Sequence, residues 1–299
     1  MTTHAFADVN GVRLHYAQDG RPDAPLLLFL HGFPEFWYAW RDQLAEFGRD
    51  HLVVAPDMRG YNLSSRPAAL EAYRIEHLVE DVRALGRHLG RRRFTLVGHD
   101  WGGAVAWAFA LAHPDLLERL VIVNMAHPVV FLRELAENPV QQEASAYITW
   151  FRRPGSAAKL LENDCTRLVR MTLGDLLDRG LATDEDRRRY IEAWTQPGAV
   201  DAGLNYYRAA TLGPPTPEEP IVAAHMTVDP AHAVVDVPTL VIWGERDPAL
   251  PVGNLDGLER YVPKLTLRRI PDGTHWVVHE QPALVNRYIR EFVAGKTET

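Results

Sequence analysis

Three ionisable side chains follow apolar runs of the sequence, in an order that suits covalent catalysis. Asp100 follows the run at 94–97, Asp247 the run at 239–243, and His275 the run at 265–270. Where such runs are parallel strands, functional side chains gather at their carboxyl ends. An ionised aspartate can attack carbon directly, and a histidine oriented by a second acid can activate water. The sequence therefore predicts Asp100 as nucleophile, Asp247 as acid and His275 as base.

Asp100 lies in the motif Gly98-His99-Asp100-Trp101-Gly102-Gly103, between an apolar run and a stretch of small residues. The glycines permit a tight turn, and the pattern is that of the Gly-x-Ser-x-Gly nucleophile turn with Asp in place of Ser. The alternative is structural: Asp100 caps a helix, Asp247 forms a turn before Pro248, and His275 starts a helix. The joint occurrence of all three in this order favours catalysis.

The elements that must position these residues alternate between strands and helices. Segments 5–9 and 12–19 flank Asn10-Gly11, a strong hairpin signal, and predict an antiparallel edge. The continuous apolar runs at 26–30, 52–55, 94–97, 120–123, 239–243 and 265–270 suit parallel strands buried on both faces. Helices are predicted at 36–47, 75–89, 101–112, from 244 through 258, and at 282–294. The prediction is one α/β domain with a mostly parallel, doubly wound sheet.

The stretch from 128 to 231 has a different pattern, mostly helical and rich in Arg, Glu and Asp. We interpret it as a helical cap inserted into the sheet domain, whose two parts are 1–127 and 232–299. Proline-containing loops at 126–128 and 213–217 mark the ends of the cap. The alternative is a Pro-rich linker between independent domains, but strand–helix patterns on both sides favour one interrupted core.

Composition narrows the class of partner. The 299 residues carry a net charge of −7, so no basic stripe for nucleic acid or anionic membrane is expected. No apolar run approaches the roughly 20 residues that span a membrane, and the first eight residues lack the basic start and apolar stretch that are typical of a leader. Cys165 is the single cysteine, which excludes an internal disulfide, and no Cys/His cluster has zinc-ligand spacing. We expect a cytoplasmic enzyme, monomer or homodimer, that takes a small molecule and needs no cofactor or metal.

The chain resembles epoxide hydrolases of the α/β-hydrolase fold, of the soluble microbial type, over nearly its whole length. The resemblance is carried by His31-Gly32-Phe33-Pro34-Glu35, by Asp57-Met58-Arg59-Gly60-Tyr61 with Ser64-Ser65-Arg66-Pro67, and by the Asp100 motif. It implies that the backbone N–H groups of Phe33 and Trp101 form an oxyanion hole. The proline peptide of the first motif is often cis in that family, and His31 is then a structural residue of the turn.

Two cap tyrosines of that family hydrogen-bond the epoxide oxygen. The matching segments are 147–155, which begins with Tyr147, and Leu204-Asn205-Tyr206-Tyr207-Arg208, where Tyr206 replaces the usual Trp. The resemblance implies Tyr147 and Tyr207, and the replacement leaves open which of Tyr206 and Tyr207 points inward. Either tyrosine could instead cover the core. Further apolar candidates for substrate contact are Trp37, Trp101, Trp150 and Phe151.

These residue types fit conversion of an epoxide and water to a vicinal diol through an Asp100 alkyl ester. A serine would leave an inert ether, whereas the aspartyl ester can be hydrolysed by water that His275 activates. The nearest alternative is a dehalogenase of the same fold. Haloalkane dehalogenases often have Asn where this chain has Phe33, and fluoroacetate dehalogenases have Arg where it has Trp101 and Ala104. A non-catalytic binding protein of this fold is a second alternative.

Overall fold

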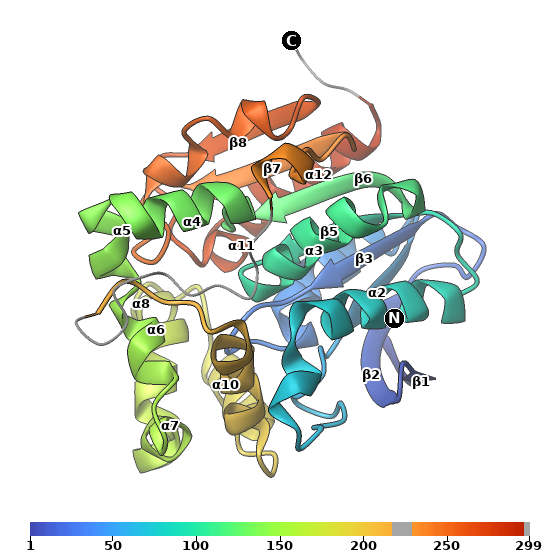
Figure 1. Cartoon of the computed structure of the whole chain (residues 1–299). Coiled ribbons are helices and arrows are strands. Elements are labelled where there is room, and N and C mark those ends of the chain that lie inside the picture. Colours follow the sequence, from blue (N-terminus) through green and yellow to red (C-terminus); the bar gives the residue numbers. More distant parts are fainter. Residues whose placement is uncertain (217–228, 296–299) are drawn as a thin grey trace.

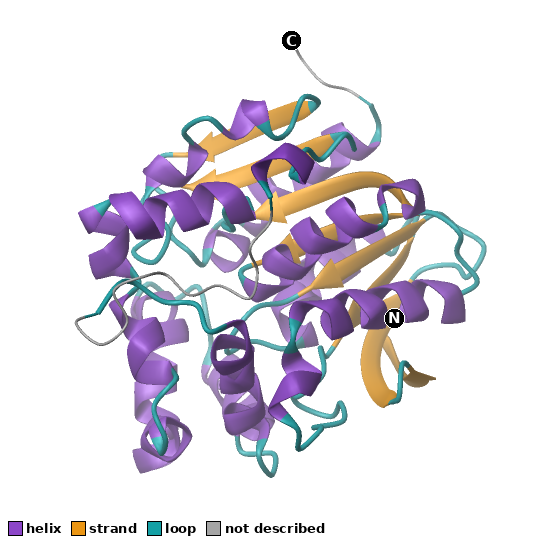
Figure 2. Ribbon diagram, in the orientation of Figure 1, coloured by secondary structure: helices purple, strands orange, loops and turns teal. Residues whose placement is uncertain are grey.

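A computed structural model describes residues 1–216 and 229–295, and these form one eight-stranded sheet in the order β1-β2-β4-β3-β5-β6-β7-β8. Strands β1 and β2 pair antiparallel, as do β2 and β4, and all other neighbours are parallel (Figure 2). The strands are β1 (Thr3–Val9), β2 (Val12–Asp19), β3 (Leu26–Leu30), β4 (Leu52–Pro56), β5 (Phe94–His99), β6 (Leu117–Val123), β7 (Thr239–Gly244) and β8 (Leu265–Ile270). The predicted mostly parallel sheet with an antiparallel N-terminal edge is confirmed.

Helices cover both faces of this sheet. α2 (Ile75–His88) packs against α3 (Trp101–Ala112) on one face (Figure 1), and α1 (Arg41–Phe47) packs against α12 (Pro282–Val293) on the other. Strands β3, β4, β5 and β7 are buried along their whole length because both faces are covered, which explains their unbroken apolar sequence. A short helix, α11 (Val277–Glu280), directly follows the loop after β8.

One predicted helix is wrong. The segment from 244 through 258 forms only the 3₁₀ turns Val252–Leu255 and Leu258–Arg260. Pro251 precedes the first turn, and Gly257 adopts a left-handed φ of +76° between the two, so no α-helix can run through this segment. The predicted helix at 36–47 is likewise divided, into a 3₁₀ turn at Trp37–Trp40 followed by α1.

Seven helices lie between β6 and β7 in the described part of the chain, and we call residues 128–210 the helical insertion. They are α4 (Pro128–Glu137), α5 (Pro139–Ala144), α6 (Ala146–Phe151), α7 (Ser156–Thr172), α8 (Gly174–Asp178), α9 (Asp184–Trp194) and α10 (Ala199–Ala210). Figure 1 shows α6, α7 and α10 grouped beside the sheet. The cap boundaries at 128 and 231 stay predictions, and residues 217–228 of the predicted cap lie outside the described residues.

Candidate active site

The backbone around Asp100 forms a tight, strained turn between β5 and α3. Asp100 has a φ of +50°, which is costly for a residue with a Cβ atom. Gly32 and Gly102 let the segment at the end of β3 approach this turn closely: a Cβ atom at Gly32 would overlap the Asp100 carboxyl, and one at Gly102 would overlap the Leu30 carbonyl. The Asp100 side chain makes no cap hydrogen bond to α3. The helix-cap alternative therefore does not describe its geometry.

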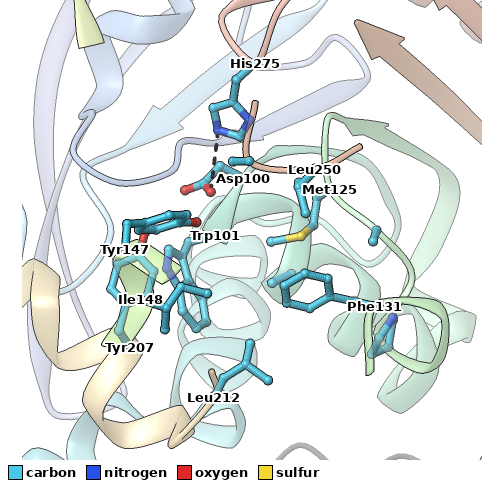
Figure 3. A pocket seen from close by; sticks show the side chains of 14 residues that line it. Asp100, Trp101, Met125, Phe131, Tyr147, Ile148, Tyr207, Leu212, Leu250 and His275 are labelled. Atoms are coloured by element: carbon cyan, nitrogen blue, oxygen red, sulfur yellow. Dashed lines mark ion pairs between the residues drawn. The ribbon is translucent and has the colours of Figure 1, made fainter. Parts of the chain in front are cut away.

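The Asp100 carboxylate instead faces the His-Gly-Phe-Pro turn and His275. The Phe33 N–H donates to Asp100 Oδ1 at 2.7 Å, and the Phe33–Pro34 peptide is cis. Trp101, the other residue of the implied oxyanion hole, begins α3 directly after Asp100. His275 Nε2 lies 3.6 Å from Asp100 Oδ2, and Figure 3 shows the imidazole directed at the carboxylate. The structure thus brings the predicted nucleophile and base into reach of each other.

Asp247 holds the other side of the His275 ring. His275 Nδ1–H donates to Asp247 Oδ2 at 2.7 Å, which leaves Nε2 to face Asp100. Backbone N–H groups of Ala249 and Leu250 donate to Asp247 Oδ1 at 2.8 and 3.0 Å. Burial opposes charge on the imidazole, but the two carboxylates outweigh it and raise the pKa of His275 well above its usual value. The two carboxylates therefore favour the protonated form of His275 as long as Asp100 carries no ester.

Asn124 completes this arrangement, although sequence reasoning did not identify it. Its Nδ2 donates to Asp247 Oδ2 at 2.7 Å, and its Oδ1 accepts from the Gly244 N–H at 2.9 Å. Asn124 directly follows β6 and has a φ of +42°, a conformation that asparagine tolerates better than most residues. The rule that led to Asp100, a polar residue at the carboxyl end of a strand, would also have found Asn124.

A buried polar cluster centred on Glu35 lies next to the backbone of His275. The fully buried Glu35 carboxylate accepts from the Tyr190 hydroxyl at 2.8 Å and lies 2.6 Å from His279 Nε2 and 3.2 Å from His99 Nδ1. His99 Nε2–H donates to the His275 carbonyl at 2.8 Å. His279 thus has a polar partner in the core. His31 is buried as well, and its Nε2 accepts from the Met58 N–H at 3.0 Å, as a structural residue of the turn would.

Tyr147 and Tyr207, from α6 and α10, lie beside Asp100 with ring centroids 6.2 Å apart (Figure 3). Burial raises the pKa of both hydroxyls, and the negative charge of Asp100 raises it further, so both keep their protons. Tyr206 points elsewhere: its hydroxyl donates to the Arg59 carbonyl at 2.9 Å. The structure therefore places Tyr207, and not Tyr206, against the nucleophile.

Two cavities meet at Asp100, Tyr147, Tyr207, Ala249 and His275. The first lobe, whose space including its opening to solvent is about 600 Å³, is lined further by Trp101, Ala104, Met125, Ala126, Pro128, Phe131, Ile148, Leu212 and Leu250. The second lobe, whose space including its opening to solvent is about 770 Å³, is lined further by Phe33, Ala144, Phe151, Met171, Pro248 and Trp276. Apart from the shared residues, every side chain in these two groups is apolar. A bound molecule must therefore be largely apolar on both sides of the reacting atoms.

Two predicted substrate contacts lie outside both lobes. The Trp37 ring packs on His4, with 4.9 Å between ring centroids, and the Trp37 backbone N–H donates to Asp57 Oδ1 at 3.0 Å. The Trp150 ring lies under the Arg167 guanidinium, 5.2 Å from its centre. Neither indole lines a lobe, whereas Trp101 lines the first lobe and Phe151 the second.

Within residues 1–216 and 229–295, no helix combines the length and apolarity needed to cross a bilayer. The same residues contain no group of three or more His, Cys, Asp or Glu side chains arranged to hold a metal ion.

Comparison with known proteins identifies the family. The chain matches a family model described as the alpha/beta hydrolase fold over residues 25–282. A Bacillus subtilis relative named AB hydrolase superfamily protein YfhM is 40% identical, with 97% of this chain and 98% of the relative covered. Epoxide hydrolase 4 of Mus musculus is 34% identical, with 99% of this chain and 80% of the relative covered.

The solved structures agree. The crystal structure of Bacillus megaterium epoxide hydrolase in complex with an inhibitor matches with a TM-score of 0.90 at 37% identity, and 97% of this chain and 100% of that chain are covered. The chain belongs to the α/β-hydrolase family and, within it, to the epoxide hydrolases. The family predicted from the sequence motifs is thereby confirmed, while the roles of the individual site residues stay predictions.

Proposed function

We propose that this protein hydrolyses apolar epoxides to vicinal diols through a covalent ester on Asp100. The observation that supports this most directly is the meeting of four groups in one buried cavity: a carboxylate, two protonated tyrosines and a histidine held by a second acid. A carboxylate can attack a saturated carbon, and the tyrosine hydroxyls can donate to the oxygen that leaves. An esterase has no need of two phenols on the far side of its nucleophile.

In the first half-reaction, Asp100 Oδ2 attacks a ring carbon, because Oδ1 is held by the Phe33 N–H. The new C–O bond forms as the epoxide C–O bond breaks, and the electron pair stays on the epoxide oxygen. Tyr147 and Tyr207 donate hydrogen bonds to that oxygen, and one of them supplies its proton. The product is a hydroxyalkyl ester of Asp100.

In the second half-reaction, His275 takes a proton from water, and the hydroxide attacks the carbonyl carbon of the ester. Esterification removes the negative charge of Asp100 beside the imidazole, which lowers the pKa of His275, so His275 passes its proton to the tyrosinate left by the first step and becomes a neutral base. The charge that develops on Oδ1 falls between the N–H groups of Phe33 and Trp101, an effect of about 3 kcal/mol per donor. Cleavage releases the diol as its alkoxide takes the proton of the added hydroxyl, and His275 keeps the proton that it took from water, which restores the starting state.

We propose further that residues 128–231 act as the cap that supplies both tyrosines and closes the cavity over the substrate. The two lobes favour an epoxide with an apolar group on either side of its ring. A cytoplasmic location and a homodimer stay predictions.

Trapping of the ester tests this proposal. His275→Gln should react once with styrene oxide and then stop, so intact mass should rise by the mass of one epoxide, and peptide mapping should place the addition on Asp100. Asp100→Asn in the same background should show no addition, and His88→Gln, at an exposed histidine, should turn over normally. Absence of the adduct from His275→Gln would contradict the mechanism. Halide release from a haloalkane by the unmodified protein would instead favour the dehalogenase alternative.

A further inference from the structure

Glu280 links the loop that carries the base to the helical insertion. It ends α11, and its carboxylate side chain is only 1% exposed. Oε2 accepts from the Thr274 N–H at 2.7 Å, and Oε1 accepts from Arg179 NH1 at 2.8 Å. Thr274 directly precedes His275 in the sequence, and Arg179 directly follows α8 of the insertion. One buried carboxylate therefore contacts the base loop with one oxygen and the insertion with the other.

The backbone at His275 is held from both directions. The N–H of the preceding residue, Thr274, donates to Glu280, and the carbonyl of His275 itself accepts from His99 Nε2–H at 2.8 Å. Neither contact involves the imidazole ring itself, which Asp247 orients. The two backbone hydrogen bonds fix the position of the His275 backbone, and the hydrogen bond to Asp247 fixes the rotation of the ring. Both the position and the rotation must be correct for Nε2 to reach a water beside the Asp100 ester.

Arg179 is the cationic partner of Glu280 among the described residues. A buried carboxylate is costly unless a cation or several donors accompany it. Arg179 is 47% exposed and also pairs with Asp175 Oδ2 at 2.8 Å, an exposed partner in α8. Loss of the guanidinium would leave the Thr274 N–H as the one hydrogen-bond donor to that carboxylate among the described residues, so the end of α11 and the preceding loop would loosen.

We propose that Glu280 and Arg179 are positioning residues, which make the water-attack step depend on how the helical insertion sits on the core. The ester-forming step uses Asp100 and the two tyrosines, so it proceeds without an accurately placed His275. Ester hydrolysis requires His275 Nε2 within reach of water. A break in the Arg179–Glu280 link therefore slows the second half-reaction and spares the first. This inference rests on the proposed function.

Single-turnover measurement separates the two steps. Excess enzyme is mixed with styrene oxide and quenched at intervals, and intact mass reports the fraction of ester while diol is measured in parallel. Arg179→Ala should form the ester at a rate within about twofold of wild type and hydrolyse it on the order of tenfold more slowly. Arg179→Lys should recover most of the hydrolysis rate. Asp175→Ala removes the other partner of Arg179 and keeps the link to Glu280, so both steps should match wild type.

Glu280→Ala removes both contacts at once, but it leaves a cavity in the protein interior and could destabilise the fold. The test therefore uses variants of Arg179, whose side chain is exposed. Ester hydrolysis at the wild-type rate in Arg179→Ala would overturn the inference, as would an equal loss in Asp175→Ala. Parallel loss of both half-reactions would also overturn it, because that pattern reports general damage to the fold. Failure of the proposed function has a different signature: no ester forms in His275→Gln, whatever the state of Arg179.

Discussion

Asn124 links the end of β6 to the end of β7 and to Asp247. The loss of stability on its replacement can therefore be worked out from its hydrogen bonds. In Asn124→Ala, the buried Gly244 N–H loses its acceptor, at about 1–3 kcal/mol, and Asp247 loses a charged hydrogen bond, at about 1.5–3 kcal/mol. Alanine at a φ of +42° adds about 1–2 kcal/mol. We expect the free energy of unfolding to fall by roughly 3.5–8 kcal/mol, a large share of the 5–15 kcal/mol that is usual for a domain.

Asn124→Gly is the matched variant, because it removes the same hydrogen bonds and relieves the backbone strain. It should be about 1 kcal/mol more stable than Asn124→Ala. Urea unfolding, followed by tryptophan fluorescence and extrapolated to water, measures both differences. A fall of less than about 1 kcal/mol in Asn124→Ala would refute the assignment of these bonds, and a Gly variant less stable than the Ala variant would refute the strain argument.

Three further predictions concern donors, pH and cavity size. Tyr147→Phe and Tyr207→Phe should each slow ester formation by about 100-fold and leave ester hydrolysis unchanged, as measured by single-turnover intact mass; slower hydrolysis alone would contradict their role. Burial lowers the pKa of His127 to about 4 from 6.5, so the unfolded chain takes up a proton first and stability falls as pH drops from 6.5 to about 4. His127→Phe should flatten that part of the urea-unfolding profile, and an identical slope in both proteins would contradict the shift. Ala104→Leu narrows the first lobe, so kcat/KM should fall at least about tenfold for a bulky aryl epoxide and little for propylene oxide; Ala108→Leu, outside both lobes, is the control.

The strands, and the meeting of the three proposed catalytic side chains, were predictable because their signals are local. Runs such as 26–30 and 94–97 must be apolar when both faces of a parallel strand are covered, and Asn10-Gly11 marks its hairpin without reference to distant residues. The carboxyl-end rule then brings Asp100, Asp247 and His275 together, because parallel strands end at one edge of the sheet. Fold and site follow from the same pattern.

Features that depend on distant partners were not predictable. Tyr206 and Tyr207 are neighbours on α10, and packing of Tyr206 on Tyr61 and Tyr73 decides which hydroxyl reaches the cavity. Trp37 looks like a substrate contact by type, but β1 supplies His4 to cover it. The contact between Arg179 and Glu280 spans 101 residues, and nothing in the residues around either one indicates the other.

The glycine contacts around Asp100 also bear on how this enzyme could be altered. Gly32 and Gly102 leave no room for a side chain, so variation there would displace the carboxylate before it changed selectivity. Ala104, Ala126 and Ala144 line the lobes, and the atoms that crowd Gly32 and Gly102 belong to other residues. A mutant library intended to produce diols of chosen handedness should therefore keep the glycines fixed and diversify the alanines, which shape how the ring is presented to Oδ2 and hence which of its two carbons is attacked.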